Sequence, residues 1–255
     1  MKAHFDPAPA ADLLANAWRS GEQLKELPAD VRPVSLAQGY DVQDAFIKRM
    51  GGGQGWKLGV GSKAAMRAAK IERPLVGRVL ASHFHRSGDT VVLPNAAPVT
   101  VEFEIAFILG RDIAPGETLD DPLSAVERKV VTFELVLSRF VNRRAVGWPS
   151  FVGDSVGFEA LVIGEVITDM QGVARTVALE VDGTEVARGL TGDELTDPVA
   201  SFGHLLEHAR ERGVTLQKGQ IATLGAIGKP FDVTGAAVIV ARYLDSELRV
   251  ATRAA

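Results

Sequence analysis

Residues 99–109 read VTVEFEIAFIL, an alternating stretch that decides the fold. Because successive side chains of a β-strand point to opposite faces, Glu102 and Glu104 share one face with the apolar residues Ala106 and Ile108. If that face is covered, the two carboxylates repel each other in a medium of low dielectric constant, and a bound cation relieves the repulsion. The stretch therefore predicts a strand with a divalent-metal site on one face. The alternative is a solvated sheet face that carries two glutamates.

A third carboxylate, Glu134, stands in a second apolar stretch, VVTFELVLSRF at residues 130–140, which suits a strand or a helix. An unpaired charge in such surroundings is costly. The chain contains no cysteine, which excludes disulfides, thiolate ligands and thiol nucleophiles. Three carboxylates without a thiolate favour a hard cation such as Mg²⁺ or Mn²⁺, with water or a chelating substrate in the remaining positions.

Outward from these two stretches, the pattern from Val79 onward is typical of β-structure. The strand-like runs are DTVVLP, ALVIGEVI, TVALEVDGTEVARG and AAVIVARYL at residues 89–94, 160–167, 176–189 and 236–244. Within the third run, Asp182-Gly183 predicts a two-residue hairpin, because a type I′ turn requires positive φ at both central positions. The centre of the molecule is thus expected to be a β-sheet.

Helices are expected around this β-structure. The first fifty residues carry apolar side chains at helical spacing in two segments, which predicts an N-terminal layer of two amphipathic helices. Further helices are expected from Pro122–Ala125 into the sequence VERKV and over Pro198–Arg212. Three glycines, residues 51–53, suggest a helical segment at 1–53 and a β-rich catalytic domain at 54–255, or one continuous domain with a turn.

Composition narrows the classes of function. The chain has 255 residues, a formal charge of −4 and no basic stripe, so nucleic acid is not an expected partner. Its first residues lack the order of a signal peptide, and no apolar run is long enough for a membrane span. We therefore expect a soluble cytoplasmic protein that does not act at a membrane.

Several weaker motifs have simpler interpretations. The glycine cluster at residues 51–63 follows a helix rather than a strand, and its order Gly61-Ser62-Lys63 does not match a phosphate-binding loop. His83 and His85 would share a strand face without a completing carboxylate, so polar strand-end residues are the expected interpretation. His204 and His208 lack the glutamate of a zinc-protease helix.

Taken together, these residues resemble the fumarylacetoacetate hydrolase superfamily and, within it, the branch of 2-keto-4-pentenoate hydratases and 4-oxalocrotonate decarboxylases. The likeness covers most of the chain. It is carried by the segment Gly55–Gly59, similar to a Gly-x-Lys-x-Gly motif; by Glu102-x-Glu104 with Glu134; by Ser138-Arg139; by Asp154; and by Thr223–Pro230.

The resemblance implies an α+β fold in which a mixed, rolled, β-rich sheet surrounds the metal, with an N-terminal helical segment and flanking helices. It implies Mg²⁺ or Mn²⁺ on Glu102, Glu104 and Glu134. The further site residues that it implies are Lys57, Glu72 and Asp154 as catalytic, and Lys57, Arg139, Ser155 and Thr223 as substrate-binding. Glu72 precedes an Arg-Pro turn, so a solvated charge is its alternative interpretation.

The activity implied by the resemblance is hydration of 2-hydroxydienoate or 2-oxo-enoate acids such as 2-oxopent-4-enoate, in aromatic-compound catabolism, through a metal-stabilised enolate. A 4-oxalocrotonate-type decarboxylase is the alternative, because it needs the same enolate. Gly157 and Phe158 stand where hydratases tend to carry serines, so a non-catalytic partner subunit that binds 2-oxo acids is kept as a second alternative. The resemblance also implies a homo-oligomer, and a complex with a pathway enzyme is a further expectation.

Overall fold

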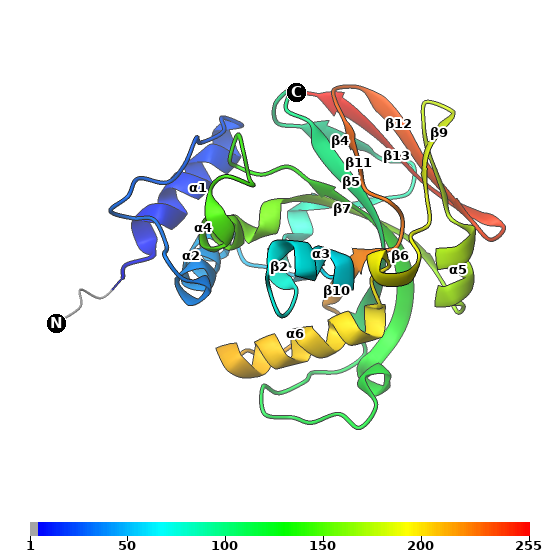
Figure 1. The fold of residues 1–255 in the computed structure, drawn as a ribbon, viewed down its shortest axis with the longest axis horizontal. Helices are drawn as coiled ribbons and strands as arrows, with labels where there is room; N and C mark the ends of the chain where they lie inside the picture. Colours follow the sequence, from blue (N-terminus) through cyan, green and yellow to red (C-terminus); the bar gives the residue numbers. More distant parts are fainter. Residues whose placement is uncertain (1–4) are drawn as a thin grey trace.

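The computed structural model describes residues 5–255, and its central feature is an eight-stranded mixed sheet (Figure 1). The strand order is β2-β1-β10-β5-β6-β7-β3, and β11 pairs with the first three residues of β5. The bounds are β1 Gly55–Gly59, β2 Leu75–Val79, β3 Phe84–Arg86, β5 Val99–Leu109, β6 Val126–Val136, β7 Phe158–Val166, β10 Ile221–Ala226 and β11 Phe231–Val233. This curled mixed sheet with flanking helices confirms the predicted α+β fold.

A smaller five-stranded sheet packs on one face of the large one, in the order β4-β13-β12-β8-β9 (Figure 1). Its strands are β4 Thr90–Leu93, β8 Ala178–Val181, β9 Thr184–Arg188, β12 Ala237–Tyr243 and β13 Ser246–Ala254. Phe103 of the large sheet packs against Tyr243 of the small one, with ring centroids 5.5 Å apart. The main hydrophobic core therefore lies between the two sheets and includes the alternate apolar residues of β5.

The predicted hairpin at Asp182-Gly183 is confirmed. It joins β8 to β9, and the two turn residues have φ values of 50° and 78°. Both values are positive, as a type I′ turn requires.

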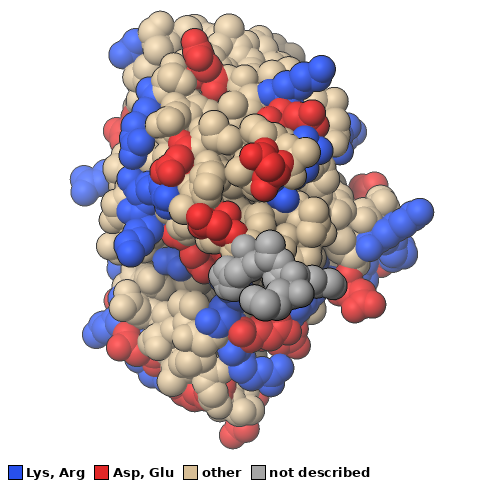
Figure 2. All heavy atoms as spheres, turned by 90° about the vertical axis from the view of Figure 1, so that its left-hand side faces the viewer, with Lys and Arg blue, Asp and Glu red and all other residues tan. Residues whose placement is uncertain are grey.

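The two N-terminal helices are confirmed as α1 Ala8–Ser20 and α2 Leu36–Arg49. Leu14 and Phe46 of these helices pack with Ala106 and Phe158 on the face of the large sheet that is turned away from the small one. Figure 2 views the molecule from the side on which Figure 1 places these helices, and shows positive and negative side chains interspersed over it. The division of the chain at residue 53 stays a prediction.

The remaining helices are α3 Lys63–Ala69, α4 Gly147–Gly153, α5 Met170–Thr176 and α6 Pro198–Arg212. Helix α6 has the predicted bounds, and the carboxylate of Asp197 accepts hydrogen bonds from the backbone N–H groups of Val199 and Ala200 at its first turn. Between residues 5 and 255, no helix has both the length and the apolar character that crossing a membrane requires.

Two expectations about local structure were wrong. The helix expected to continue from Pro122–Ala125 into VERKV is a single 3₁₀ turn, and Val126 already begins β6. Pairing of this segment with β5, in which Arg128 lies opposite Ile108, outweighs its helical propensity. The β-structure also begins before Val79, because β1 and β2 form an antiparallel pair around the glycine-rich segment.

Candidate metal centre

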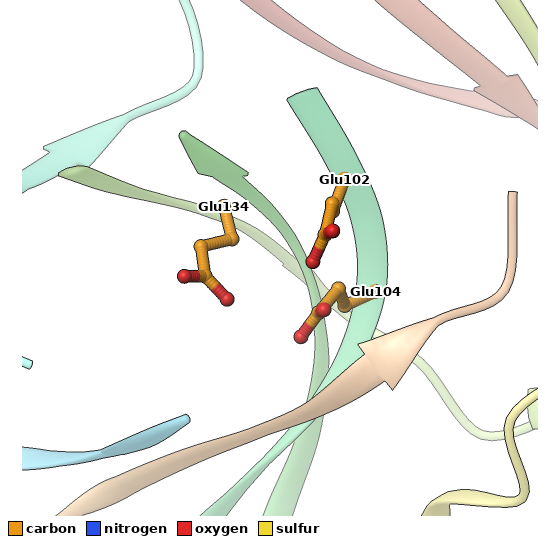
Figure 3. Close-up of side chains that lie close together, drawn as sticks. All are labelled: Glu102, Glu104 and Glu134. Carbon is orange, nitrogen blue, oxygen red and sulfur yellow. The ribbon is translucent and has the colours of Figure 1, made fainter. Parts of the chain in front are cut away.

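Three glutamates meet on two neighbouring strands (Figure 3). Glu102 of β5 lies directly opposite Glu134 of β6 in the antiparallel register, and Glu104 follows two residues along β5. Each side chain offers a carboxylate oxygen, and these three atoms lie within 4.8 Å of one another. Glu104 and Glu134 are fully buried, while Glu102 is half-buried. We call these three residues the glutamate triad, and its carboxylates could hold a metal ion.

The buried carboxylates of the triad are short of partners. Oε1 of Glu104 and Oε2 of Glu134 are buried and have no partner, and Oε1 of Glu134 is in contact only with the Lys57 ammonium. Burial raises the pKa of Glu104 well above its ordinary value, and the carboxylates of Glu134 and Glu102 raise it further. Burial likewise raises the pKa of Glu134 to about 7, against the opposing effect of the Lys57 ammonium. A hard divalent cation would supply the missing partner for the two oxygens that have none, so the donor set fits Mg²⁺ or Mn²⁺.

The second oxygen of Glu104 is held by the neighbouring strand. Thr223 of β10, which sequence reasoning assigned to substrate, donates its hydroxyl proton to Glu104 Oε2, and the N–H of Gly225 donates to the same atom over 3.1 Å. Thr132 of β6 lies in hydrogen-bond contact with Thr223, 2.9 Å between the two hydroxyl oxygens. These contacts fix the orientation of Glu104 and leave its other oxygen free.

Lys57 lies at the centre of β1 and is as buried as the triad. Its ammonium forms an ion pair with Glu134 and donates a hydrogen bond to the carbonyl oxygen of Val156 over 3.2 Å. Gly77 of β2, opposite Lys57, makes room for this side chain, because a Cβ there would lie 2.7 Å from both Lys57 Cγ and the Ser155 carbonyl oxygen. The sheet therefore places a cation directly beside the carboxylates.

The Val156 carbonyl is presented by an unusual backbone segment. Ser155, Val156 and Gly157 all have positive φ, at 50°, 54° and 74°. This conformation costs a β-branched residue such as valine about 1–2 kcal/mol. The Ser155 hydroxyl holds the segment in place, because it accepts from the N–H of Arg78 at 2.7 Å and donates to the carbonyl of the same residue at 2.8 Å. Ser155 is predicted from the sequence to bind substrate. In the structure, its hydroxyl makes both of these hydrogen bonds to the backbone of β2.

Glu102 lines two cavities. The first, of about 160 Å³, is lined by Lys57, Glu102, Arg143, Arg144, Trp148 and Phe151. We call it the arginine cavity. The second, of about 440 Å³, is lined by Ser62, Glu102, Glu194, Thr196 and Lys229, among others, and we call it the lysine cavity. Val60 lines both and is itself a β-branched residue at a φ of 60°. A ligand at the triad therefore has access to both cavities.

Asp154 and Arg139, also predicted as site residues, belong to a separate buried cluster. Asp154 accepts hydrogen bonds from the Ser138 hydroxyl at 2.7 Å and from the Arg139 backbone N–H and Nε at 2.9 and 2.6 Å. The Arg139 guanidinium also donates to Glu159 at 3.1 Å and lies 4.3 Å from the ring centre of Trp18. Neither Asp154 nor Arg139 lines the arginine cavity or the lysine cavity. Their contacts hold this part of the chain in place, and their predicted catalytic and substrate-binding roles stay predictions.

Glu72, the remaining predicted catalytic residue, is exposed in the turn between α3 and β2. It lines neither cavity at the triad. Its place in the structure agrees with the alternative interpretation, a solvated charge before a turn.

The histidine pairs lie outside the metal centre. In the part of the chain that the structure describes, the glutamate triad is the one group of three histidine or acidic residues close enough to share an ion. His208 is buried against Tyr40, with ring centroids 4.6 Å apart, and burial lowers its pKa to about 4. It is therefore a neutral core residue at physiological pH.

Sequence reasoning missed the residues that arrange the triad's surroundings. Thr132 was detectable, because it lies two residues before Glu134 on the same strand face. Val60 and Val156 gave no signal, since valine is uncommon at positive φ. The fold and the triad together define a class of protein: a curled mixed sheet whose buried carboxylates can hold a hard divalent cation.

Comparison with known families makes this class specific. Residues 57–244 match the family model described as Fumarylacetoacetate (FAA) hydrolase C-terminal, and this region contains the whole triad and Lys57. The chain belongs to the fumarylacetoacetate hydrolase family, as its motifs predicted.

Two curated relatives align with nearly the whole chain. A TodF product hydratase from Pseudomonas putida is 28% identical over 245 residues, covering 91% of this chain and 90% of the relative. A 4-oxalocrotonate decarboxylase from Pseudomonas putida is 26% identical over 242 residues and covers 91% of each chain. Both relatives are enzymes, and a hydratase is a lyase.

A solved structure supports the fold. The 4-oxalocrotonate decarboxylase from Pseudomonas putida G7, complexed with magnesium and adipate, superposes with a TM-score of 0.85 at 24% identity. The match covers 98% of this chain and 97% of that one. The described part of the chain, including its N-terminal helices, therefore shares the architecture of that protein.

Proposed function

We propose that this protein is a metal-dependent lyase that hydrates 2-hydroxydienoate or 2-oxo-enoate acids, of which 2-oxopent-4-enoate is a small example. The observation that carries the proposal is the glutamate triad, in which two buried carboxylate oxygens, Glu104 Oε1 and Glu134 Oε2, lack partners and the half-buried member Glu102 lines two cavities. The names of the relatives support the reaction class, since several are 2-keto-4-pentenoate hydratases.

The triad residues Glu102, Glu104 and Glu134 would hold Mg²⁺ or Mn²⁺. A bound divalent cation supplies Lewis-acid polarisation of the 2-oxygen and carboxylate of a 2-oxo acid, which stabilises the negative charge that develops during hydration. Magnesium in the decarboxylase structure supports this choice of ion.

The other residues of the site bind and orient the substrate. Lys57 has an ammonium fixed by Glu134 and Val156, and the residue lines the arginine cavity, where it would donate a hydrogen bond to the substrate or move a proton at Nζ. The apolar walls Trp148 and Phe151 would cover the hydrocarbon part of the substrate and exclude water. Thr223 keeps Glu104 in its orientation, so its role would be indirect.

Decarboxylation of a 2-oxo-dienoate is the second candidate. It is favoured by the 4-oxalocrotonate decarboxylase relatives, which match this chain over as much of its length as the hydratases do. The same charge stabilisation at the 2-oxygen would serve both reactions, and the products distinguish them.

We infer a cytoplasmic homo-oligomer that takes a small-molecule acid as substrate, in a complex with a second enzyme of the pathway. The resemblance to the family supports this inference. Light scattering of the purified protein tests the oligomer: a single species of two or more chains is expected, and a monomer would contradict it.

The activity test follows the loss of the dienol absorbance of 2-hydroxypenta-2,4-dienoate and of 2-hydroxyhexa-2,4-dienedioate, with Mg²⁺ and after its removal by a chelator. A hydroxylated product without CO₂ is expected, whereas CO₂ release would favour the decarboxylase. Glu102→Gln should abolish turnover. Its matched control is Glu127→Gln, an exposed glutamate of β6. Absence of turnover in the wild type would instead indicate a binding subunit.

A further inference from the structure

We infer that this protein takes 2-oxo acids that end in an uncharged hydrocarbon tail, and that this tail lies in a third cavity next to the lysine cavity. The inference rests on the proposed function, because it requires the 2-oxo acid head group at the triad. The third cavity measures about 920 Å³ and is lined mainly by residues of α5 and of the segment 188–199, together with Ile105 and Ile227. We call it the outer cavity.

The volumes of the three cavities show where a long tail has room. The arginine cavity, at about 160 Å³, is smaller than the roughly 300–1,000 Å³ of pockets that enclose a drug-sized ligand, so it covers only the carbons next to the head group. The lysine cavity, at about 440 Å³, and the outer cavity, at about 920 Å³, both fall within that range. Space for a longer tail therefore lies on the side of the lysine cavity.

The outer cavity separates charged from apolar lining residues. Its charged lining residues are all exposed, namely Lys63, Arg175, Glu185, Arg188, Asp193 and Asp197. Its buried lining residues are Ile105, Ala174, Val177, Thr196 and Ile227. Four of these five are apolar, and the fifth carries only a hydroxyl. Because the buried part of the cavity offers hydrocarbon surface and no charge, it favours an uncharged tail over a second carboxylate.

The outer cavity and the lysine cavity share a wall. Leu190 and Thr196 line both of them. Thr196 also lies beside the residues that hold the triad: a Cβ at Gly225 would lie 2.8 Å from Thr196 Cγ2, and the N–H of Gly225 donates to Glu104 Oε2 over 3.1 Å. A tail that leaves Glu102 through the lysine cavity therefore meets Leu190 and Thr196 before it enters the outer cavity.

Leu190 is placed to control this passage. Its backbone is fixed, because its N–H donates to the carbonyl of Ile227 over 2.8 Å. Its side chain is half-buried and, among residues 5–255, belongs neither to a hydrophobic core cluster nor to the partly buried residues packed against one. The apolar surface of Leu190 is therefore available to cover a tail, and we assign it as a specificity-determining residue.

A binding experiment with saturated 2-oxo acids, which cannot be hydrated, tests the inference. Isothermal titration calorimetry in excess Mg²⁺ compares 2-oxopentanoate, 2-oxooctanoate and 2-oxodecanoate. Each methylene group that becomes buried should tighten binding by about threefold, so 2-oxodecanoate should bind at least about a hundredfold more tightly than 2-oxopentanoate. Decanoate has the tail but lacks the 2-oxygen that chelates the ion, so it should bind at least about tenfold more weakly than 2-oxodecanoate.

Substitutions of Leu190 test the path of the tail. Leu190→Trp should fill the passage and lower the ratio of the affinities for 2-oxodecanoate and 2-oxopentanoate to below about fivefold, whereas Leu190→Ala should keep the ratio. Leu36→Trp is the matched control. Leu36 is an exposed leucine at the start of α2 that lines none of the three cavities, so this variant should also keep the ratio.

Equal binding of the three 2-oxo acids by the wild type would overturn the inference and leave the proposed function standing. Binding of 2-oxodecanoate without Mg²⁺, or equally tight binding of decanoate, would also overturn it, because the tail would then bind without a head group at the triad. An unchanged affinity ratio in a Leu190→Trp protein that unfolds like the wild type would contradict the path past Leu190. If no 2-oxo acid binds in the presence of Mg²⁺, the proposed function and the inference fail together.

Discussion

Two buried acidic clusters lie in this protein, and they differ in whether their hydrogen bonds are complete. In the cluster of Asp154, Arg139 and Glu159, both Asp154 oxygens accept hydrogen bonds, and Arg139 donates to Asp154, Glu159 and the carbonyl of Phe158. In the glutamate triad, Oε1 of Glu104 and Oε2 of Glu134 accept none, and a single lysine lies beside the three carboxylates. A buried cluster whose polar atoms all have hydrogen-bond partners stabilises the fold. A buried cluster whose oxygens lack partners is suited to binding a cation.

The comparison is most strongly tested by removing Asp154. Asp154→Ala should lower the free energy of unfolding by about 3–5 kcal/mol, because it removes one of the two carboxylates that pair with the buried Arg139 guanidinium and leaves the Ser138 hydroxyl and Arg139 Nε without their acceptor. Denaturant unfolding measures the loss. A change below about 1 kcal/mol, the usual size for exposed ion pairs, would show that this cluster is not structural.

Substitution in the glutamate triad should change the free energy of unfolding in the opposite direction. In the metal-free protein, Glu104→Gln should raise the free energy of unfolding by about 1–3 kcal/mol, because it removes a buried carboxylate with an unpaired oxygen and two acidic neighbours. The same change should weaken Mn²⁺ binding by more than about a hundredfold, beyond the usual effect of residues outside the ligand shell. Unfolding and calorimetric titration of one variant measure both effects, and a variant that is destabilised yet binds Mn²⁺ normally would refute the assignment.

Thr223 tests whether the hydrogen bonds around Glu104 serve the metal or the substrate. Thr223→Val keeps the shape of the side chain and removes the hydroxyl that donates to Glu104, so Mn²⁺ affinity should fall by about 10–100-fold. Thr223→Ser should restore most of the affinity. Unchanged Mn²⁺ affinity in Thr223→Val, together with weaker substrate binding, would favour the direct substrate contact that the sequence suggested.

The smallest expected effect is the pH dependence of Mg²⁺ affinity. Burial raises the pKa of Glu134 to about 7, so protons compete with the metal below that pH and Mg²⁺ affinity should fall by about fivefold between pH 7 and pH 6. In the metal-free protein the sign is reversed. The folded-state pKa of Glu134 lies above its ordinary value of 4.5, so its contribution to stability is present below pH 4.5 and is lost as the pH rises through 7. Thermal unfolding with and without Mg²⁺ across pH 5–8 checks both trends, and a Mg²⁺ stabilisation independent of pH would contradict them.

The parts of the site that follow from strand alternation were predictable from the sequence. The pairing of Glu102 with Glu104 on one face depends only on the two-residue period of β5, and the hairpin at Asp182-Gly183 depends only on the turn type. The position of Glu134 opposite Glu102 required the register of β6, which local sequence does not determine.

The remaining features depend on contacts between distant segments. Asp154 and Ser155 lie next to each other in sequence, yet their contacts differ. Asp154 pairs with Arg139, whereas the Ser155 hydroxyl forms hydrogen bonds with the backbone of β2. Thr223 reaches Glu104 because β10 pairs with β5 across more than a hundred residues of chain. These roles depend on the tertiary arrangement, and a linear motif cannot assign them.

The most direct test of the metal centre is the anomalous difference map of a crystal soaked in Mn²⁺. A single strong peak per chain is expected, about 2 Å from a carboxylate oxygen of each of Glu102, Glu104 and Glu134. The peak should disappear in Glu134→Gln and persist in the exposed control Glu127→Gln. A wild-type crystal with no peak at the triad, or with its main peak elsewhere, would contradict the assignment of these carboxylates to a divalent cation.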